Sequence, residues 1–257
     1  MDYLNINKEA WDKRTKLHVD SKFYDVKVFK DGKSSLNKVE LEQMGNVEGR
    51  KLLHLQCHFG QDTLSWARKG AITTGVDLST EAIEQANKLN SALGLDATFI
   101  ARDIYQFGHE NTEKFDLVFT SYGVLCWLPD LSRWAQVVAD SLTIGGEFHL
   151  VEFHTFNDLL CGYSYFPQGE PDAEVEGTYT ENCDGTKSKV LTWAHSLSEV
   201  INALIVAGLS IEHFEEYPYS PYDCFEGLEY VPDQGYQLLH KGQQVPLLYS
   251  IKARKVT

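Results

Sequence analysis

The chain has 257 residues, of which 43% are hydrophobic and 12% aromatic, enough for one large domain or one domain with a sizeable insertion. Its 23 Lys and Arg against 37 Asp and Glu give a formal net charge of −14. That balance repels phosphate backbones, so nucleic acid and anionic membrane surfaces are poor partners. No stretch approaches the ~18 consecutive apolar residues of a membrane span. Five cysteines without CxxC spacing favour a reduced, cytoplasmic setting.

Residues 1–49 form an N-terminal extension before the first expected strand. Asn7 predicts an N-cap with a helix starting at Lys8, and the apolar spacing of 36–44 predicts a short amphipathic helix. Two interpretations remain open: the extension covers the edge of a sheet, or it is a helical lid that closes over a ligand. Its side chains suited to ligand contacts are Trp11, Arg14, His18 and Tyr24.

Residues 51–77 have the pattern of a strand, a loop, a helix and a second strand. An apolar run at 52–55 precedes a tight loop at 56–60, a helix follows and ends at Gly70, and the second strand ends on Asp77. Backbone N–H groups at the loop and helix N-terminus favour a ligand carboxylate or phosphate. A carboxylate at the tip of the next strand can accept two hydrogen bonds from a ribose diol. The unit therefore predicts a nucleoside-binding crevice.

Strands and helices continue to alternate along residues 78–257. Two aromatic-rich regions, at about 154–193 and 217–245, lack sustained periodicity and predict insertions in the domain that spans 50–257, where long loops are more often functional than idle. The expected strands are 97–100, 115–120, 147–153, 209–214 and 246–254, and the expected helices are 79–94, 131–142 and 196–208.

Several segments carry a family resemblance in the right order. They are the 52–60 loop, Gly75-Val76-Asp77-Leu78-Ser79, Ala101-Arg102-Asp103-Ile104, Phe115 to Val118 with Ser121 to Leu125, and Leu142-Thr143-Ile144-Gly145-Gly146. This set resembles the class I S-adenosylmethionine-dependent methyltransferases of small-molecule type. The resemblance implies an α/β fold: a doubly wound, mostly parallel, seven-stranded Rossmann-like sheet with an antiparallel last strand. It covers about residues 50–153 by motif and 195–254 by topology.

The first motif departs from the family pattern. The family usually has an acid on the strand and three glycines in the loop, whereas these positions are His54, Gln56, His58 and Gly60. Glycine permits positive φ and close backbone approach to a ligand. Gln56 and His58 must achieve this differently, and His54 cannot copy the contact of a carboxylate with the ammonium group of the cofactor.

The resemblance implies S-adenosyl-L-methionine as the cofactor. Asp77 would bind the ribose, and Asp103 would contact the adenine beside apolar Ile104, although an Asp at a strand end also commonly makes an Asx-turn. The implied cofactor-binding residues are Gln56, Cys57, His58, Gly60, Asp77, Leu78, Asp103, Ile104, Ser121 and Tyr122.

Methyl transfer from a sulfonium depends mainly on alignment, with a base near the acceptor's proton where one is needed. His154 is the first candidate for a base or substrate anchor, with Tyr122 and Glu152 beside it at the expected strand ends; a plain surface histidine is the alternative for His154. An aromatic-lined pocket suits a small organic acceptor, including a cationic one. The expected substrate-binding residues are Trp11, Arg14, His18, Tyr24, Trp127, Tyr163, Tyr165 and Phe166.

The leading hypothesis is thus an S-adenosylmethionine-dependent methyltransferase (EC 2.1.1.-). A non-catalytic binding protein of the same fold is the alternative, because the loop has lost glycines. A dinucleotide-dependent oxidoreductase is weaker, since it needs a G-x-G-x-x-G fingerprint. No metal is expected, because alternate residues of the run from His54 to His58 point to opposite faces. A homodimer is left open.

Overall fold

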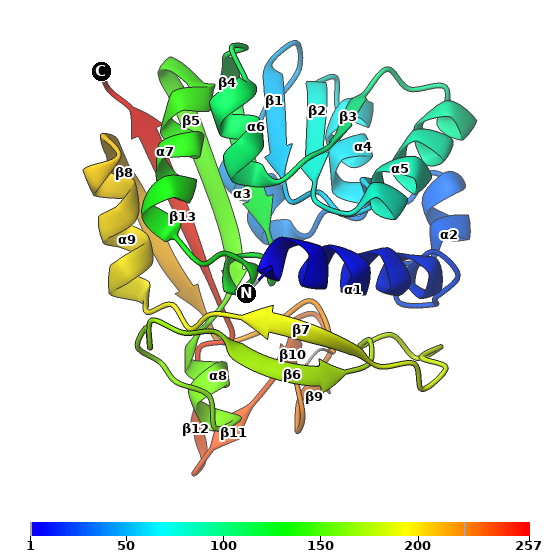
Figure 1. Ribbon diagram of the computed structural model, residues 1–257, viewed down its shortest axis with the longest axis vertical. Helices are drawn as coiled ribbons and strands as arrows, with labels where there is room; N and C mark the ends of the chain where they lie inside the picture. The colour runs from blue at the N-terminus through cyan, green and yellow to red at the C-terminus, as the bar shows by residue number, and fades with distance from the viewer. Residues whose placement is uncertain (1, 224) are drawn as a thin grey trace.

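A seven-stranded sheet forms the centre of the computed structural model, which describes residues 2–223 and 225–257 (Figure 1). The strands from β3 to β5 run parallel, and β13 is antiparallel to both of its neighbours. The doubly wound, mostly parallel sheet predicted from the sequence is therefore confirmed. The strand order is β3 (Thr98–Ala101), β2 (Ile72–Asp77), β1 (Lys51–Leu55), β4 (Phe115–Ser121), β5 (Leu142–Phe153), β13 (Leu248–Lys255) and β8 (Leu209–Tyr217).

Two helix layers cover the sheet because the apolar residues of its strands alternate between faces. On β1, Leu52 packs with Trp66 in one cluster, while Leu53 joins Trp134 in the cluster on the other face. Burying each such side chain stabilises the fold by about 1.5–3 kcal/mol. One layer holds α3 (Lys38–Met44), α4 (Gln61–Arg68) and α5 (Thr80–Leu93); the other holds α6 (Ile104–Glu110), α7 (Leu131–Ser141) and α9 (Leu197–Val206).

The first helix, α1 (Tyr3–His18), begins earlier than the sequence predicts. Asp2 is its N-cap, and its carboxylate accepts a hydrogen bond from the backbone N–H of Asn5. The N-cap prediction for Asn7 is wrong because that side chain is buried inside the helix and serves a tertiary contact. Its amide donates to the carbonyl of Leu191 at 2.8 Å and accepts from the same residue's N–H at 2.9 Å.

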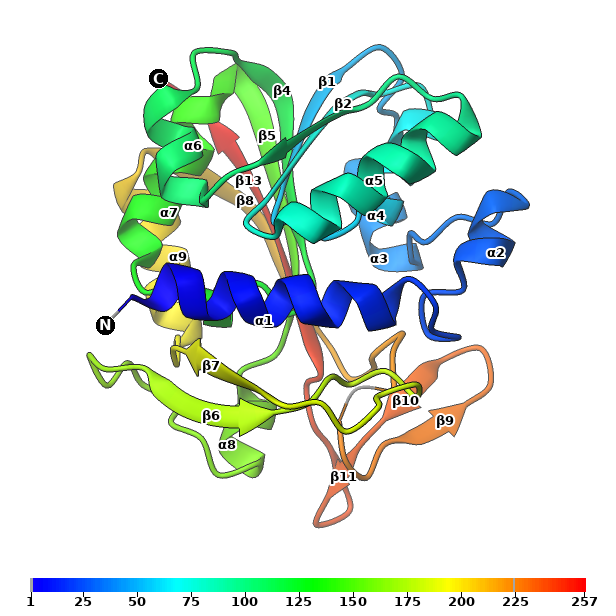
Figure 2. The ribbon, with the colours of Figure 1, turned by 45° about the vertical axis from the view of Figure 1, so that its right-hand side comes forward.

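α1 runs across the carboxyl ends of the parallel strands, between the sheet and the hairpin formed by β6 (Asp172–Glu176) and β7 (Ser188–Thr192) (Figure 2). The Asp12 carboxylate fixes it to the start of α5, accepting from the Ser79 hydroxyl at 2.7 Å and the Glu81 N–H at 3.1 Å. The extension is therefore integrated into the fold. The remaining elements are α2 (Val26–Lys30), η1 (Leu125–Trp127), α8 (Phe156–Leu160), β9 (Glu229–Val231), β10 (Gly235–Gln237), β11 (Leu239–His240) and β12 (Gln243–Gln244).

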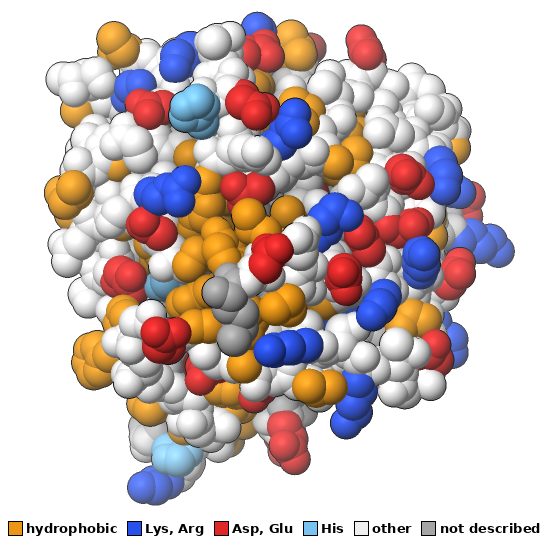
Figure 3. Space-filling model, in the orientation of Figure 1, with side chains coloured by type: hydrophobic (Ala, Val, Ile, Leu, Met, Phe, Trp, Pro, Cys, Tyr) orange, Lys and Arg blue, Asp and Glu red, His pale blue; other side chains and the backbone are white. Residues whose placement is uncertain are grey.

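The face that α1 crosses has a mixed surface (Figure 3). Basic and acidic side chains are interspersed over its right half, and hydrophobic side chains gather beside the start of α1. Among the described residues on this face, the basic side chains form no extended patch for a phosphate backbone. Among the residues described, no helix is both long and apolar enough to cross a membrane.

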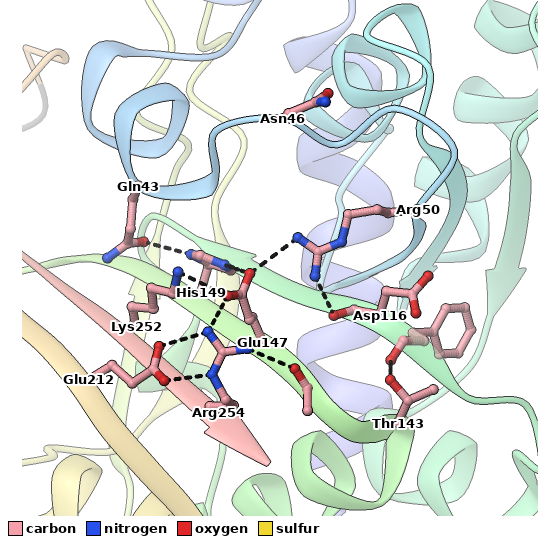
Figure 4. Close-up of polar contacts among 12 residues, drawn as sticks. Gln43, Asn46, Arg50, Asp116, Thr143, Glu147, His149, Glu212, Lys252 and Arg254 are labelled. Atoms are coloured by element: carbon pink, nitrogen blue, oxygen red, sulfur yellow. Dashed lines mark hydrogen bonds and ion pairs between the residues drawn. The ribbon is translucent and has the colours of Figure 1, made fainter. Parts of the chain in front are cut away.

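A network of charges joins β5 to its neighbours (Figure 4). The Glu147 carboxylate lies 3.2 Å from Arg50, 3.0 Å from Lys252 and 2.6 Å from Arg254. The contact with His149, followed by Lys252 and Arg50, holds the pKa of Glu147 well below its usual range, although burial opposes this. The network connects the loop before β1 with β5 and β13.

Replacing Glu147 with Gln should destabilise the protein, because three cations would then face one another without their shared anion. We expect a loss of about 1–3 kcal/mol in the free energy of unfolding at pH 7, less than for a fully buried pair because the cationic partners keep some solvent exposure. Denaturant titration measures this loss. The matched control is Glu212→Gln, which removes the second carboxylate bound to Arg254 and should cost less; equal losses would contradict the central role of Glu147.

Candidate active site

A cavity of about 750 Å³ lies at the carboxyl ends of the central strands and is lined on one side by α1. Every residue of the predicted cofactor-binding set lines it, from Gln56 in the loop after β1 to Tyr122 after β4. Of the residues predicted to bind substrate, it is lined by Trp11, Arg14, Tyr24 and Trp127. The structure therefore brings together residues separated by more than a hundred positions in the sequence.

The loop after β1 has the left-handed backbone that glycines would normally supply. Gln56 has a φ of 58° and His58 a φ of 51°, while the remaining glycine, Gly60, has 81°. Such a conformation costs a side chain about 1–2 kcal/mol. Two contacts hold it: the Gln56 amide donates to the carbonyl of Val124 at 2.8 Å, and the His58 N–H donates to the Asp77 carboxylate at 2.8 Å. These two hydrogen bonds thus hold Gln56 and His58 in the left-handed conformation that glycine would adopt without strain.

Asp77 ends β2 and faces this loop. One carboxylate oxygen accepts the His58 N–H, and the other accepts the Ser79 N–H at 2.8 Å. A carboxylate offers about four lone-pair sites, so acceptors remain for a ligand hydroxyl. Burial raises the pKa of Asp77 to about 6, even though these hydrogen bonds favour the ionised form.

The sequence left two roles open for Asp103, a contact with adenine and a turn at the end of the strand, and its position is compatible with both. Its carboxylate caps α6 by accepting the Gln106 N–H at 3.0 Å, and the residue also lines the cavity. Beside it, Ile104 is largely buried in the core and also lines the cavity, and Leu78 lines it from the end of β2. These two side chains supply the apolar surface that a purine ring needs.

His54 occupies the strand position where the family has an acid. Burial lowers its pKa to about 3, so its imidazole is neutral. Its Nδ1 lies 2.8 Å from the Thr63 hydroxyl, while its buried Nε2 has no hydrogen-bond partner. His54 lines the cavity as a neutral group.

His18 lies behind the cavity wall instead of facing the cavity. Its Nδ1 is 2.8 Å from Nε2 of His58, and its ring stacks on Tyr24 with centroids 5.1 Å apart. Burial, and then the charge of Arg14, lowers the pKa of His18 to about 3. The prediction of substrate contact for His18 is therefore replaced by a role in ordering His58 and Tyr24.

Arg14 and two tryptophans close one wall of the cavity. The guanidinium carbon lies 5.3 Å from the ring centroids of both Trp11 and Trp127, and an ion pair of 2.6 Å joins Arg14 to Glu176 on the β6–β7 hairpin. Cation–π attraction and the ion pair hold the helix, the loop after β4 and the hairpin together.

Glu152 lines no part of this cavity, although the sequence made it a catalytic candidate. Its buried carboxylate accepts the backbone N–H groups of Gly123, Val124 and Leu125, the last two at 2.9 and 3.1 Å. These bonds use the carboxylate to shape the loop after β4. Glu152 therefore holds the loop after β4 from outside the cavity where the sequence analysis had expected it.

His154 also lies away from the cavity, because the chain turns there into α8. Its Nε2 is 2.7 Å from the Glu216 carboxylate. Together with three predicted substrate-binding residues, Tyr163, Tyr165 and Phe166, it lines a second, more open cavity. The expectation that these four residues share the cofactor crevice is corrected accordingly.

Glu40 is a buried acid beside the cavity that sequence reasoning missed. It is fully buried on α3, and its carboxylate accepts the hydroxyl of the cavity residue Tyr122 at 2.7 Å and the Asn37 N–H at 2.7 Å. Burial, and then the nearby charge of Asp62, raises the pKa of Glu40 to about 7. The amphipathic pattern of 36–44 gave no sign of this role, since it explained the residue as part of a polar face.

Asp62 was missed as well. It lines the cavity from the first turn of α4, and its carboxylate accepts the Ser35 hydroxyl at 2.6 Å and the Ser121 hydroxyl at 3.2 Å. Burial raises its pKa. Its position directly after the motif loop was the signal that could have found it. Within residues 2–223 and 225–257, no group of three or more His, Cys, Asp or Glu side chains could hold a metal ion.

The sheet order with its antiparallel β13, and the cavity at the ends of β1, β2 and β4, define the fold of a class I methyltransferase. Residues 52–146 match the family model described as a methyltransferase domain. The central part of the chain is thus similar to methyltransferase domains, and its sheet has their fold.

Curated relatives are similar over part of the chain. A ubiquinone biosynthesis O-methyltransferase of Proteus mirabilis is 28% identical over 159 residues, covering 59% of this chain and 62% of that protein. An uncharacterized methyltransferase of Synechocystis sp. is 33% identical over 130 residues, covering 50% of this chain and 59% of that protein. The chain thus spans less than two thirds of the length of these relatives.

Solved structures share the fold over most of the chain. An S-adenosylmethionine-dependent methyltransferase of Mesorhizobium loti superposes with a TM-score of 0.58 and 21% identity, covering 88% of this chain and 99% of that one. One from Clostridium acetobutylicum gives a TM-score of 0.59 and 17% identity, covering 96% and 98%.

The cavity's side chains fit S-adenosyl-L-methionine, the methyl donor of this family. Asp77 offers free lone pairs for a ribose diol, and Leu78 and Ile104 offer apolar surface for adenine. At Gly60 an added Cβ would lie 2.6 Å from the Phe99 ring, so the loop there leaves no space for a side chain.

The conformation of Gln56 yields a paired prediction. Gln56→Ala loses the bond to Val124 and keeps the left-handed strain, whereas Gln56→Gly loses the bond and relieves the strain. We expect the glycine variant to be more stable than the alanine variant by about 1 kcal/mol. Thermal melting of the two variants measures the difference; an alanine variant of equal or greater stability would contradict it.

The pKa of Asp77 predicts how cofactor binding depends on pH. With Asp77 as the expected ribose-binding residue, its ionised carboxylate would accept the ribose hydroxyls, and protonation below about pH 6 would remove that capacity. Binding of S-adenosylhomocysteine should therefore weaken by about tenfold between pH 7 and pH 5. Calorimetric titration at both values tests this. Asp77→Asn should bind weakly at both; an unchanged pH dependence in that variant would assign the titration to another group.

Proposed function

We propose that the protein transfers the methyl group of S-adenosyl-L-methionine to a small organic acceptor. The observation that carries this proposal is the single cavity in which all the predicted cofactor-binding residues meet. Its volume of about 750 Å³ exceeds the needs of the nucleoside part alone and lies within the usual range of small-molecule sites.

The part of the cavity left for the acceptor is aromatic. Its walls include Phe23, Tyr24, Tyr222 and Phe225, together with Trp11 from α1. Aromatic rings favour flat or cationic organic molecules through dispersion and ring-face attraction. This lining supports a small-molecule acceptor in preference to a polymer.

When bound, S-adenosylmethionine supplies an electrophilic methyl group on a positive sulfur, so alignment provides most of the acceleration. The protein's residues orient the reactants and exclude water. Tyr122 donates its hydroxyl proton to Oε2 of Glu40 and accepts a longer hydrogen bond from the Asn37 amide at 3.4 Å. One lone pair of the phenol oxygen then remains for a hydrogen bond from an acceptor hydroxyl or amine. Glu40, with a pKa of about 7, is a positioning residue that can share that proton.

Residues 1–49 act, in this proposal, as a lid over the reactants. Tyr3, Asn7, Trp11 and Arg14 of α1 line the cavity, which places the helix over bound reactants. We also propose that the protein is cytoplasmic and binds no nucleic acid. The net charge of −14 supports the second point, because it repels phosphate backbones. Size-exclusion chromatography tests whether two copies form a homodimer.

Calorimetric titration of the purified protein tests the proposal. S-Adenosylmethionine and S-adenosylhomocysteine should bind with a Kd on the order of micromolar, and NADH should not bind. Trp11→Ala serves as a lid variant: it should weaken acceptor turnover while leaving binding of S-adenosylhomocysteine within a few-fold of the wild type.

Two results would contradict the proposal. Binding of NADH alone would favour the oxidoreductase alternative. Tight binding of both adenosyl ligands, with no methyl transfer to any member of a panel of phenols, amines and carboxylic acids, would favour the non-catalytic binding protein.

A further inference from the structure

The carboxylate of Asp62 faces the cavity without a cationic partner. Its two oxygens accept hydrogen bonds from neutral hydroxyls, those of Ser35 and Ser121, and no ion pair joins it to a Lys, Arg or His in the described part of the chain. Burial raises its pKa, which records the cost of keeping this charge away from water. A cation bound in the cavity would lower that cost.

A second buried carboxyl group adds to the negative potential on this side of the cavity. Glu40 is fully buried, its hydrogen bonds come from Asn37 and Tyr122, and the charge of Asp62 contributes to raising its pKa. Two carboxyl groups that influence each other in a desolvated region attract a positive ligand more strongly than either alone.

The imidazole of His54 provides an independent pointer to a ligand. His54 is only 2% exposed, lines the same cavity and leaves Nε2 without a partner. Because the ring is neutral and Nδ1 contacts Thr63, Nε2 can accept a hydrogen bond when Nδ1 carries the proton. Thr63 follows Asp62 directly in α4, so the histidine and the carboxylate belong to one local unit.

We propose that Asp62 and Nε2 of His54 form an ammonium-binding subsite for the α-amino group of the methionine part of S-adenosylmethionine. An ammonium has three donors, and this pair supplies a charged and a neutral acceptor. Ser121, hydrogen-bonded to Asp62, is the last residue of β4 and also lines the cavity. The negative charge missing at position 54 is thus supplied from the first turn of the next helix. The inference rests on the proposed function of the cavity.

Three ligands separate this subsite from the rest of the cofactor site. They are S-adenosylhomocysteine, its analogue in which hydrogen replaces the α-amino group, and 5′-methylthioadenosine, which lacks the amino-acid part. In Asp62→Asn, affinity for S-adenosylhomocysteine should fall roughly 10- to 100-fold, because a charge-assisted hydrogen bond is lost. Affinity for the other two ligands should change by less than about twofold.

Asp103→Asn is the matched control, since it alters another cavity acid on the adenine side. It should weaken all three ligands alike. Asp62→Asn should remain folded, because the amide oxygen can still accept from a serine hydroxyl; a thermal melt checks this, and His54→Phe provides a second variant that should show the same ligand selectivity with a smaller loss.

The outcomes distinguish the two proposals. If Asp62→Asn leaves the affinity for S-adenosylhomocysteine unchanged, or weakens all three ligands equally, the ammonium subsite is overturned while the cofactor site stands. The subsite is also overturned if the wild-type protein binds S-adenosylhomocysteine no better than the analogue that lacks the α-amino group. If the wild-type protein binds none of the three, the proposed function fails as well.

Discussion

The hydrogen bond from the His58 N–H to the Asp77 carboxylate is the contact on which the site depends. It joins the ends of β1 and β2, holds a non-glycine residue in a left-handed conformation, and orients the carboxylate that faces the cavity. The cost of burying Asp77, visible in its raised pKa, is offset by two backbone donors. Loop shape and the proposed ligand binding therefore rest on the same carboxylate.

The fold could be predicted from the sequence because its signals are local. Apolar runs such as 52–55, glycines that end helices, and the acid after β2 are each read within a few residues. The predicted cofactor-binding residues follow from the same signals, since parallel strands bring their carboxyl ends to one edge. Even the glycine-poor loop lies at the cavity, although the sequence did not reveal which hydrogen bonds of Gln56 and His58 would hold its backbone.

The rest depends on long-range packing that the sequence does not display. His154 follows β5 directly, yet the chain turns away there and pairs it with Glu216. Glu152 is buried near the end of β5, but its carboxylate accepts hydrogen bonds from the backbone N–H groups of residues 123–125. Conversely, Glu40 comes from an ordinary amphipathic helix and reaches Tyr122 only because α3 packs against the sheet. The role of each of these side chains depends on which distant residue packs against it. Residue spacing in the sequence does not specify such a partner.

The amide pairing of Asn7 with Leu191 has a consequence for synthesis on the ribosome. The partners are 184 positions apart, so α1 emerges first and waits for β7. At typical rates of ~5–20 residues per second, that wait is roughly 10–40 seconds. During this interval α1 can already contact the start of α5 through Asp12, but its attachment to β7 is completed only after residue 191 has been added.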